Sequence, residues 1–271
     1  MTNYLEVTNL SKSFDSFQLH NISFTLPKGY IMGLIGPNGS GKTTTIKLIL
    51  NMLKRTGGTV KVMGLDNIAE EQKVKSELGV VFDTNYFSDD WKVSQVEKSI
   101  SVFYPNWDSQ KFADMLRKFH IAPTKKVKEL SKGMQMKLML ACAFSYDAKL
   151  LILDEPTSGL DPVSRDELLK ILSEYIEDGE HSVYITYISY GELYFTGSKD
   201  DFVDMFRIVK GGIEELSDDL KNKAAGIRTF PTGFEALMKT EDISGFPNLT
   251  VEPATIDEIV VFTSKKGDDY E

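Results

Sequence analysis

Cysteine is almost absent from this chain. Cys142 is the single cysteine, so the sequence excludes a fold held together by internal disulfides and is typical of a reducing compartment. Its neighbours, residues 140–144, are small or apolar and read as one face of a packed helix. We therefore interpret Cys142 as a buried structural thiol and not as a reactive group.

Long hydrophobic runs are also missing. The longest ones, residues 31–35 and 150–153, are far shorter than the roughly 20 apolar residues that a membrane-spanning helix needs. Residues 1–6 have neither a basic stretch nor an apolar core, so we expect no signal peptide. A function at a membrane would then require a separate chain that crosses it.

Positive charge is scarce relative to negative charge. The 31 Lys and Arg residues are outnumbered by 40 Asp and Glu residues, which gives a net charge of −9. Because proteins that coat nucleic acid are usually basic, we expect no nucleic-acid partner. The chain has 271 residues, of which 41% are hydrophobic and 26% are charged. This balance is typical of one large globular domain, or of a domain with a small appendage.

The hydrophobic pattern of the first 53 residues indicates an α/β unit. Residues 4–8 and 22–26 alternate between apolar and polar, which predicts strands with one buried face. Residues 31–35 are almost continuously apolar, as in strands that are buried on both faces. A glycine-rich loop follows, and then a helical pattern over residues 44–53. The order strand, glycine loop, helix is typical of nucleotide-binding units.

The rest of the chain divides into two further parts. We expect strands at residues 57–64, 79–82, 149–153, 182–188 and 192–196, and a helix at residues 162–177. Residues 85–148 are more polar and helical in period, which predicts a helical subdomain inserted into a sheet domain over residues 1–205. Glycines and prolines then divide residues 206–271 into short segments. We expect a small α+β accessory region there, with residues 259–262 as its last strand.

Residues 36–43 fit the phosphate-loop pattern Gly-x-x-x-x-Gly-Lys-Ser/Thr. The glycines let backbone N–H groups converge on a phosphate without Cβ clashes, and the N-terminal dipole of the next helix favours the same anion. We expect Lys42 to bridge the terminal phosphates and the Thr43 hydroxyl to bind Mg²⁺. The predicted ATP contacts of this loop are Gly36, Pro37, Asn38, Gly39, Ser40, Gly41, Lys42, Thr43 and Thr44.

Two acidic residues follow the second apolar strand. Residues 150–153 lead directly into Asp154 and Glu155, and ligands of open α/β sheets bind at the carboxyl ends of strands. Asp154 is expected to hold Mg²⁺, and Glu155 to act as the general base on the attacking water. Alone, this pair would be an ordinary solvated loop. Together with the phosphate loop, it predicts an ATPase.

A third motif narrows the interpretation. Residues 130–135, Leu-Ser-Lys-Gly-Met-Gln, resemble the Leu-Ser-Gly-Gly-Gln signature of ABC transporter ATPases, and residues 156–162 are similar to the dimer-facing loop of that family. The resemblance covers about residues 4–205. It implies an α/β fold: a P-loop NTPase (RecA-like) core with an antiparallel β edge and an inserted α-helical subdomain. The C-terminal α+β extension would follow this core.

The resemblance also implies a site that one chain cannot complete. In this family two domains enclose two ATP molecules head to tail, as a homodimer or as a pair of different ATPase subunits. The Ser131 hydroxyl and the Gly133 backbone N–H would contact the γ-phosphate held by the partner's phosphate loop. Phe14 matches the aromatic residue that stacks on adenine, and Phe17 is the competing candidate.

The sequence departs from the family pattern in its signature and after the strand expected at residues 79–82. Lys132 replaces a signature glycine and Met134 replaces the glutamine, whereas the two contact residues of the signature remain. Asp83 stands where the family usually has glutamine. We expect Asp83 to serve the same catalytic and metal-sensing role, because it keeps an oxygen acceptor. A subset of related exporter ATPases carries an acid at this point.

A third departure concerns histidine. The family places a histidine that contacts the γ-phosphate after the strand following the dimer-facing loop, but the histidines here are His20, His120 and His181. Two strands look spliced together near Tyr184 and Ile185, with the histidine and one helix missing between them. Three explanations remain open: residues omitted from the printed chain, a deletion, or a natural absence with poor hydrolysis. An intact mass of 30.5 kDa would exclude the first.

These motifs favour an ATP-driven exporter subunit for drugs, antibiotics or peptides. It would be peripheral on the cytoplasmic face of the membrane and docked on a separate permease, whose coupling helix we expect near residues 87–91. A non-transport ABC ATPase is one alternative, although the chain has one phosphate loop and no long heptad run. A regulatory nucleotide-binding subunit with little turnover is the other. Substrate contacts would lie in the permease, so the transported substrate stays open.

Overall fold

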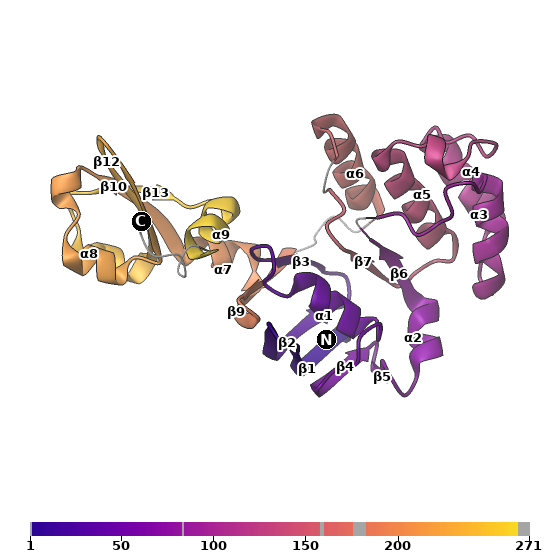
Figure 1. Cartoon of the computed structure of the whole chain (residues 1–271), viewed down its shortest axis with the longest axis horizontal. Coiled ribbons are helices and arrows are strands. Elements are labelled where there is room, and N and C mark those ends of the chain that lie inside the picture. The colour runs from indigo at the N-terminus through magenta and orange to yellow at the C-terminus, as the bar shows by residue number, and fades with distance from the viewer. Residues whose placement is uncertain (1, 83, 158–159, 176–182, 265–271) are drawn as a thin grey trace.

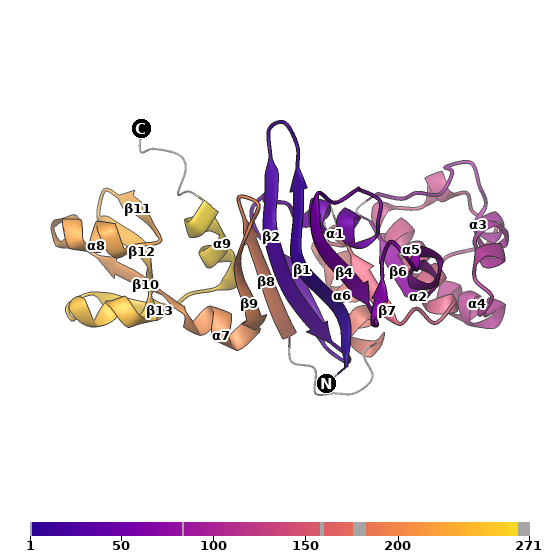
Figure 2. The ribbon, with the colours of Figure 1, turned by 90° about the horizontal axis from the view of Figure 1, so that it is seen from below.

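The structure is a computed structural model that describes residues 2–82, 84–157, 160–175 and 183–264. Its elements form three parts along the long axis of the molecule (Figures 1 and 2). The N-terminal sheet and first helix lie in the middle, the inserted helices lie at one end, and the C-terminal lobe lies at the other end. The mixed α/β architecture confirms the predicted fold class.

A four-stranded antiparallel sheet forms the predicted β edge. Its order is β2-β1-β4-β5, with β1 at Asn3–Ser13, β2 at Gln18–Pro27, β4 at Gly57–Val62 and β5 at Leu65–Asp66. The first two strands are longer than their alternating segments predict, because the pairing continues past irregularities in register. Asn9, whose φ is 49°, lies within one of these register shifts, so the two-residue period is lost there although the strand continues.

Five further strands form two small sheets in the middle of the molecule. β3 (Ile31–Ile35) pairs in parallel with β8 (Val183–Ser189), which pairs antiparallel with β9 (Glu192–Ser198). β6 (Leu78–Val81) pairs in parallel with β7 (Leu150–Leu153). β8 runs without interruption through the junction at which the sequence suggested two spliced strands. One strand therefore both pairs with β3 and leads into the hairpin with β9.

Three helices accompany these strands. α1 covers Lys42–Ile49, α2 covers Glu71–Glu77 and α6 covers Pro162–Tyr175. α6 begins at the predicted proline, which suits the first turn of a helix. α1 ends earlier than its hydrophobic pattern suggests, and Asn51 follows with a φ of 52°, a left-handed conformation that commonly terminates helices.

The inserted segment is helical, as predicted. It contains α3 (Val93–Ile100), α4 (Ser109–Lys118) and α5 (Lys132–Ser145), with short 3₁₀ turns at Ser101–Phe103 and Val127–Glu129. Apolar side chains from α4 and α5 pack with Leu168 of α6 in one core. Cys142 lies in this core and is 2% exposed, and burial raises the pKa of its thiol. The prediction of a buried structural cysteine is confirmed.

Aromatic side chains close the end of this core. Trp107 packs against Phe112 and Tyr146, with ring centroids 5.3 Å and 6.5 Å apart. Tyr104 stacks on Tyr146 with the centroids 3.7 Å apart. The Tyr146 hydroxyl donates a hydrogen bond of 2.9 Å to the carbonyl of Leu78, so the inserted helices are tied to strand β6.

The C-terminal lobe is a small antiparallel sheet with helices. Its strand order is β11-β12-β10-β13. The elements are α7 (Lys199–Asp204), β10 (Phe206–Gly211), α8 (Asp218–Lys223), β11 (Gly226–Phe230), β12 (Gly233–Lys239), β13 (Thr250–Pro253) and α9 (Ile256–Ser264), with 3₁₀ turns at Ile213–Glu215 and Thr240–Gly245.

The prediction of a last strand at residues 259–262 was wrong, because α9 covers this segment. Thr255 and Glu258 form a capping box before the apolar run: the Thr255 hydroxyl accepts from the Glu258 N–H at 3.2 Å, and the Glu258 carboxylate accepts from the Thr255 N–H at 2.8 Å. Ile259 and Phe262, three residues apart, are buried together. The four apolar residues alone could not distinguish a strand from one face of a helix.

The lobe packs directly on strand β8. Tyr187 of β8 is fully buried in a core with Phe202, Phe206 and Ile259, and its hydroxyl is hydrogen-bonded to the Thr263 hydroxyl of α9. The boundary at residue 205 stays a prediction, since the two sides share this core. Within the described ranges, no helix has the length and apolar character needed to cross a membrane.

Candidate functional site

The loop over residues 36–43 connects β3 to α1, as the phosphate-loop motif predicts. Gly36, Gly39 and Gly41 have φ angles of 149°, 78° and 110°, in the range that favours glycine. A Cβ atom on Gly36 would lie 2.0 Å from the carbonyl oxygen of Ile188, and one on Gly41 would lie 2.7 Å from the Leu19 side chain. These glycines therefore let the loop pass close to its neighbours.

Lys42 lies folded over the loop. Its Nζ donates to the carbonyl oxygens of Gly36 and Pro37 at 2.9 Å and 3.2 Å, and it is 3.9 Å from Oε1 of Glu155. The Lys42 side chain is 14% exposed, whereas that of Glu155 is 46% exposed. The ammonium group is thus held at the mouth of the loop, where it can neutralise an anion.

Thr43 and Asp154 meet although they are far apart in the sequence. The Thr43 hydroxyl donates to Oδ1 of Asp154 at 3.2 Å. Asp154 is 5% exposed, and its backbone N–H continues the strand pairing by donating to Val81 at 2.9 Å. Glu155 follows with a left-handed φ of 48°, which is unusual for a residue with a side chain. The sequence predicted this pairing of loop and strand end.

A pocket of about 330 Å³ lies over the loop. It is lined by Phe17, Asn38, Gly39, Gly41, Lys42, Thr43, Thr44 and Glu155. Phe14, the first choice for an adenine contact, does not line this pocket and is 43% exposed. The rings of Phe14 and Phe17 lie 6.3 Å apart, and the pocket favours Phe17.

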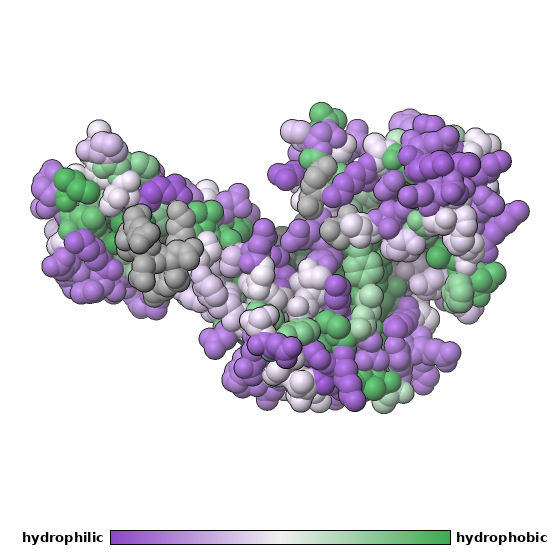
Figure 3. Space-filling model, in the orientation of Figure 1, coloured by the Kyte–Doolittle hydropathy of each residue, from purple (hydrophilic) through white to green (hydrophobic). Residues whose placement is uncertain are grey.

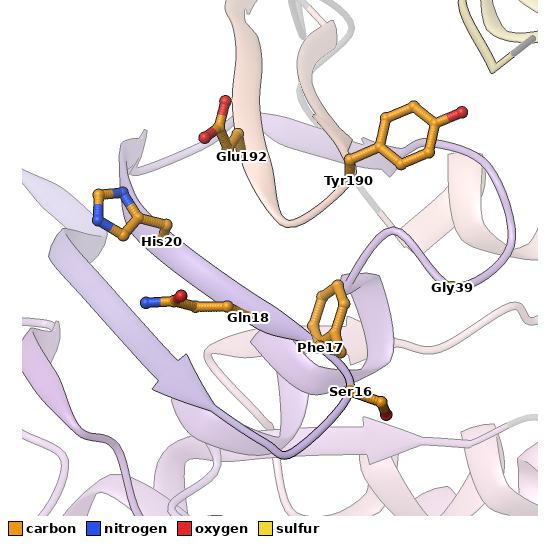
Figure 4. A pocket seen from close by; sticks show the side chains of 7 residues that line it. All are labelled: Ser16, Phe17, Gln18, His20, Gly39, Tyr190 and Glu192. Atoms are coloured by element: carbon orange, nitrogen blue, oxygen red, sulfur yellow. The ribbon is translucent and has the colours of Figure 1, made fainter. Parts of the chain in front are cut away.

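A second pocket of about 410 Å³ adjoins the first (Figure 4). It shares Phe17 and Gly39 with the pocket over the loop, and its other lining residues are Ser16, Gln18, His20, Tyr190 and Glu192. Figure 4 shows that this pocket lies between the turn joining β1 to β2 and the hairpin of β8 and β9.

The hairpin of β8 and β9 supports the phosphate loop, which the sequence did not predict. The Gly191 N–H donates to the Ser40 carbonyl at 3.0 Å, and the Gly191 carbonyl accepts from the His20 N–H at 2.8 Å. A Cβ atom on Gly191 would lie 1.9 Å from the carbonyl oxygen of Gln18. The only signal was the Tyr-Gly pair between two strands, typical of a tight hairpin turn.

The signature residues lie apart from this pocket. Ser131 caps α5 by accepting from the Met134 N–H at 3.3 Å, and its side chain is exposed. Gly133 is buried against α6, where a Cβ atom would lie 3.2 Å from the Ser164 hydroxyl. Ser164 in turn donates its hydroxyl to Asp161 at 2.6 Å, and this contact lowers the pKa of Asp161.

The oxygen ligands at the pocket suit Mg²⁺. Thr43 supplies a hydroxyl and Asp154 a carboxylate, and Mg²⁺ is commonly held by one or two such groups together with phosphates and water. Asp83, the third predicted ligand, lies outside the described residues. In the part of the chain that the structure describes, no group of three or more His, Cys, Asp or Glu residues could hold a metal by itself.

The two histidines in the described ranges do not line the phosphate pocket. His20 lies in β2 and lines the second pocket. His120 follows α4 with a φ of 55°. His181 lies outside the described residues, so the prediction that the chain lacks a γ-phosphate histidine stays a prediction.

Known proteins share this sequence pattern. The sequence model of a family described as "ABC transporter" matches residues 19–158. The ABC transporter ATP-binding protein YtrB of Bacillus subtilis is 34% identical over 183 residues, which are 67% of this chain and 62% of that protein. Nod factor export ATP-binding protein I of Sinorhizobium fredii is 35% identical over 201 residues, which are 68% of this chain and 55% of that protein. The chain thus spans about 62% and 55% of the lengths of these two relatives.

The matches to another relative and to a solved structure cover a larger share of the lengths of those two proteins. The glutamine transport ATP-binding protein GlnQ of Escherichia coli is 32% identical over 223 residues, covering 77% of this chain and 90% of that protein. A solved structure described as the ATP binding subunit of an ABC transporter has a TM-score of 0.66 at 24% identity. The match covers 73% of this chain and 91% of that chain, and it supports the fold.

Proposed function

The chain belongs to the ABC transporter family of ATP-binding domains, and from this premise we propose that it is the ATP-hydrolysing motor subunit of a membrane transporter. It would act on the cytoplasmic face of the membrane, paired head to tail with a second ATPase subunit. The observation that carries the proposal is the contact between Thr43 and Asp154 at 3.2 Å. It joins the phosphate loop to the acidic strand end in one site.

Each predicted catalytic and metal-binding residue has a role in this proposal. Lys42, already among loop carbonyls, would turn toward the terminal phosphates and neutralise their charge. Thr43 and Asp154 would hold Mg²⁺, which supplies charge neutralisation on the phosphates when it is bound. Glu155, more exposed than Lys42, is free to accept a hydrogen bond from an attacking water and take its proton. Asp83 would assist at the metal.

The partner subunit would complete the site. Ser131 is exposed at the N-terminus of α5 and lines neither pocket of its own chain. A helix N-terminus favours an anion, so the start of α5 would receive the γ-phosphate bound by the partner's loop. The exposed Lys132 beside it adds positive charge that the family signature lacks.

A permease would dock beside the inserted helices. An apolar groove of about 340 Å³ lies between β6 and the insert, with Phe82, Tyr86, Ile100 and Tyr104 among its lining residues. Nearby, Val102 and Phe103 are 75% and 73% exposed. Large exposed apolar groups of this kind mark interaction surfaces. This groove adjoins the segment 87–91 at which the sequence predicted permease contact.

Export is the finer part of the proposal. It is supported by the acid at position 83, where importers of the family usually carry glutamine, and by the name of the Nod factor export relative. The name of GlnQ, a glutamine transport protein, does not favour export. Transport by inside-out vesicles that contain the chain and its permease would decide the direction. Uptake of substrate into such vesicles corresponds to export from the cell.

The motor proposal is tested with Glu155→Gln. This variant should bind ATP and accumulate as an ATP-bound dimer in size-exclusion chromatography, because the base is lost while the nucleotide contacts remain. Phosphate release should fall about 100-fold or more. Glu214→Gln is the matched control, since Glu214 is an exposed acid of the C-terminal lobe. Unchanged ATP turnover in Glu155→Gln would contradict the assignment of the base.

A nucleotide-binding subunit with little turnover is the second candidate. It is favoured by one observation: neither histidine in the described ranges lines the phosphate pocket. Tight ATP binding by the wild-type chain, with no phosphate release at saturating Mg²⁺, would support this candidate. The motor function would then be excluded for the chain by itself.

A further inference from the structure

The hairpin of β8 and β9 contacts the phosphate loop at two points. At the end of β8, the carbonyl oxygen of Ile188 lies so close to Gly36 that a Cβ atom there would be 2.0 Å away. In the turn, Gly191 donates its N–H to the Ser40 carbonyl at 3.0 Å. The hairpin therefore holds the loop at its first residue and again in its middle.

The same hairpin also contacts the C-terminal lobe. Tyr187 of β8 is buried in the core of the lobe, and its hydroxyl is hydrogen-bonded to the Thr263 hydroxyl of α9. In the turn, the Tyr190 hydroxyl donates to the carbonyl of Ser264, the last residue of α9, at 2.6 Å. The molecule narrows between its middle part and the lobe, where this hairpin lies (Figures 1 and 3). One short segment thus contacts both the phosphate loop and the lobe.

The two contacts with the lobe differ in how easily they break. Tyr187 is 0% exposed, so moving it would expose apolar surface of the shared core to water, which is costly. Tyr190 is 60% exposed, and water can replace the Ser264 carbonyl as the partner of its hydroxyl, so this bond breaks at little cost. Strand β8 therefore stays attached to the lobe, while the turn has two arrangements: engaged with α9 or released from it.

A bound nucleotide distinguishes between these two arrangements. In the structure the Lys42 ammonium group donates to the carbonyls of Gly36 and Pro37, and so helps to hold the loop. Both bonds are lost when Lys42 turns toward a phosphate. The contacts of the hairpin with Gly36 and Ser40 are then a larger share of the bonds that hold the loop. Nucleotide binding therefore favours the engaged turn, which is the difference between states that coupling requires.

We propose that the C-terminal lobe regulates nucleotide binding through Tyr190, a positioning residue that ties the turn of the β8–β9 hairpin to the end of α9 and thereby supports the phosphate loop. This inference rests on the proposed function, because it concerns the same phosphate site. Coupling between two sites is reciprocal. The lobe thus raises the affinity of the loop for nucleotide, and bound nucleotide stabilises the end of α9 to the same extent.

Removal of one hydroxyl group tests the coupling. Tyr190→Phe keeps the ring and loses the bond to Ser264, so affinity for a non-hydrolysable ATP analogue with Mg²⁺ should fall about two- to tenfold. Tyr194→Phe is the matched control, because Tyr194 lies in β9 of the same hairpin, is 44% exposed, and lines neither of the two pockets at the loop. Its affinity should equal that of the wild-type protein. Titration calorimetry measures both affinities, and circular dichroism checks that both variants are folded.

Hydrogen exchange separates this positioning role from a direct contact with the nucleotide, since Tyr190 lines the second pocket. Without nucleotide, the Gly191 amide should exchange about two- to tenfold faster in Tyr190→Phe, because its bond to Ser40 is less well supported. In the wild-type protein, the analogue should slow exchange of the amides in residues 259–264 by about two- to tenfold. Tyr190→Phe should lose this slowing, whereas a purely structural hydrogen bond would leave it in place.

Three results would overturn the inference. They are unchanged affinity in Tyr190→Phe, an equal loss of affinity in Tyr194→Phe, and exchange in residues 259–264 that responds to the analogue equally in the wild-type protein and in Tyr190→Phe. Failure of the wild-type protein to bind the analogue would instead contradict the proposed function. In that case the Gly191 amide still decides: a faster exchange rate in Tyr190→Phe supports the positioning role, and an unchanged rate overturns it.

Discussion

Replacing Gly191 with alanine should weaken both the fold and the nucleotide site. Gly191 follows Tyr190 in the tight turn of the β8–β9 hairpin. The φ angle of Gly191 is 80° and that of Tyr190 is 49°. The backbone of Gly191 donates to Ser40 in the phosphate loop and accepts from His20. A Cβ atom would lie 1.9 Å from the carbonyl oxygen of Gln18, so the turn must move away from both partners.

The expected loss has two sources. A left-handed conformation costs a residue with a Cβ atom about 1 to 2 kcal/mol. Displacing the turn also removes two backbone hydrogen bonds, each contributing about 0.5 to 1.5 kcal/mol to stability. The free energy of unfolding should therefore fall by about 2 to 5 kcal/mol. For a unit of this size, that corresponds to about 4 to 20 °C in Tm.

Gly64→Ala is a closely matched control. Gly64 follows Met63 in the turn between β4 and β5. The φ angle of Gly64 is 80° and that of Met63 is 49°, and a Cβ atom on Gly64 would have no other atom within 4 Å. This variant has the conformational cost alone, so its Tm should fall by about 2 to 8 °C. Calorimetry measures both Tm values, and titration calorimetry measures ATP affinity.

ATP affinity should fall roughly fivefold in Gly191→Ala, because about 1 kcal/mol of support for the loop is lost. It should be unchanged in Gly64→Ala. Equal losses of Tm in the two variants would refute the argument, because the contact with Gln18 would then contribute nothing. Unchanged ATP affinity in Gly191→Ala would show that the hairpin does not support the loop.

Three further predictions concern the pocket and the effect of pH. Thr43→Val should reduce affinity for ATP about tenfold with Mg²⁺ present and much less in EDTA, since we propose that the hydroxyl next to Asp154 is a metal ligand; equal losses would contradict this role. Phe17→Ala should weaken ATP binding about tenfold and Phe14→Ala much less, because stacking contributes about 1 to 3 kcal/mol; the opposite order would restore the sequence-based choice. Hydrogen bonds from the backbone N–H groups of the next turn, and then the charge of Arg55, lower the pKa of Asp66. The stability that Asp66 contributes is thus present above its unfolded pKa and is lost as the pH falls through the lower pKa of the folded state. The free energy of unfolding of Asp66→Asn, measured by denaturation, should therefore depend less on pH below about pH 4 than that of the wild-type protein.

The nucleotide pocket was predictable because its chemistry is local in the sequence. A phosphate loop needs glycines, a lysine and a hydroxyl at fixed spacing, and these requirements are visible in residues 36–43 without any fold. The roles expected of Thr43 and Asp154 place both residues at the same Mg²⁺, and the role of Asp154 followed from the rule that ligands of open α/β sheets bind at the carboxyl ends of strands. In the structure the Thr43 hydroxyl donates to Asp154 at 3.2 Å, and the role of the pair at a metal stays a prediction.

Features that depend on tertiary contacts were not predictable. The choice between Phe14 and Phe17 depends on how the turn between β1 and β2 lies over the loop, which no local pattern encodes. The role of Gly191 arises from a hairpin far from the loop in sequence. The helix at residues 259–262 was missed because its capping box begins at Thr255, before the apolar run, and a run of four apolar residues suits either a strand or a helix.

The positions of the aromatic residues of the inserted helices have a spectroscopic consequence. The chain has two tryptophans, Trp91 and Trp107, and both lie in the inserted segment, with Trp107 packed against Phe112 and Tyr146. Tryptophan emission therefore reports the environment of this segment and is blind to the C-terminal lobe. An unfolding curve recorded by emission should match one recorded by far-UV circular dichroism only if the lobe and the insert unfold as one cooperative unit.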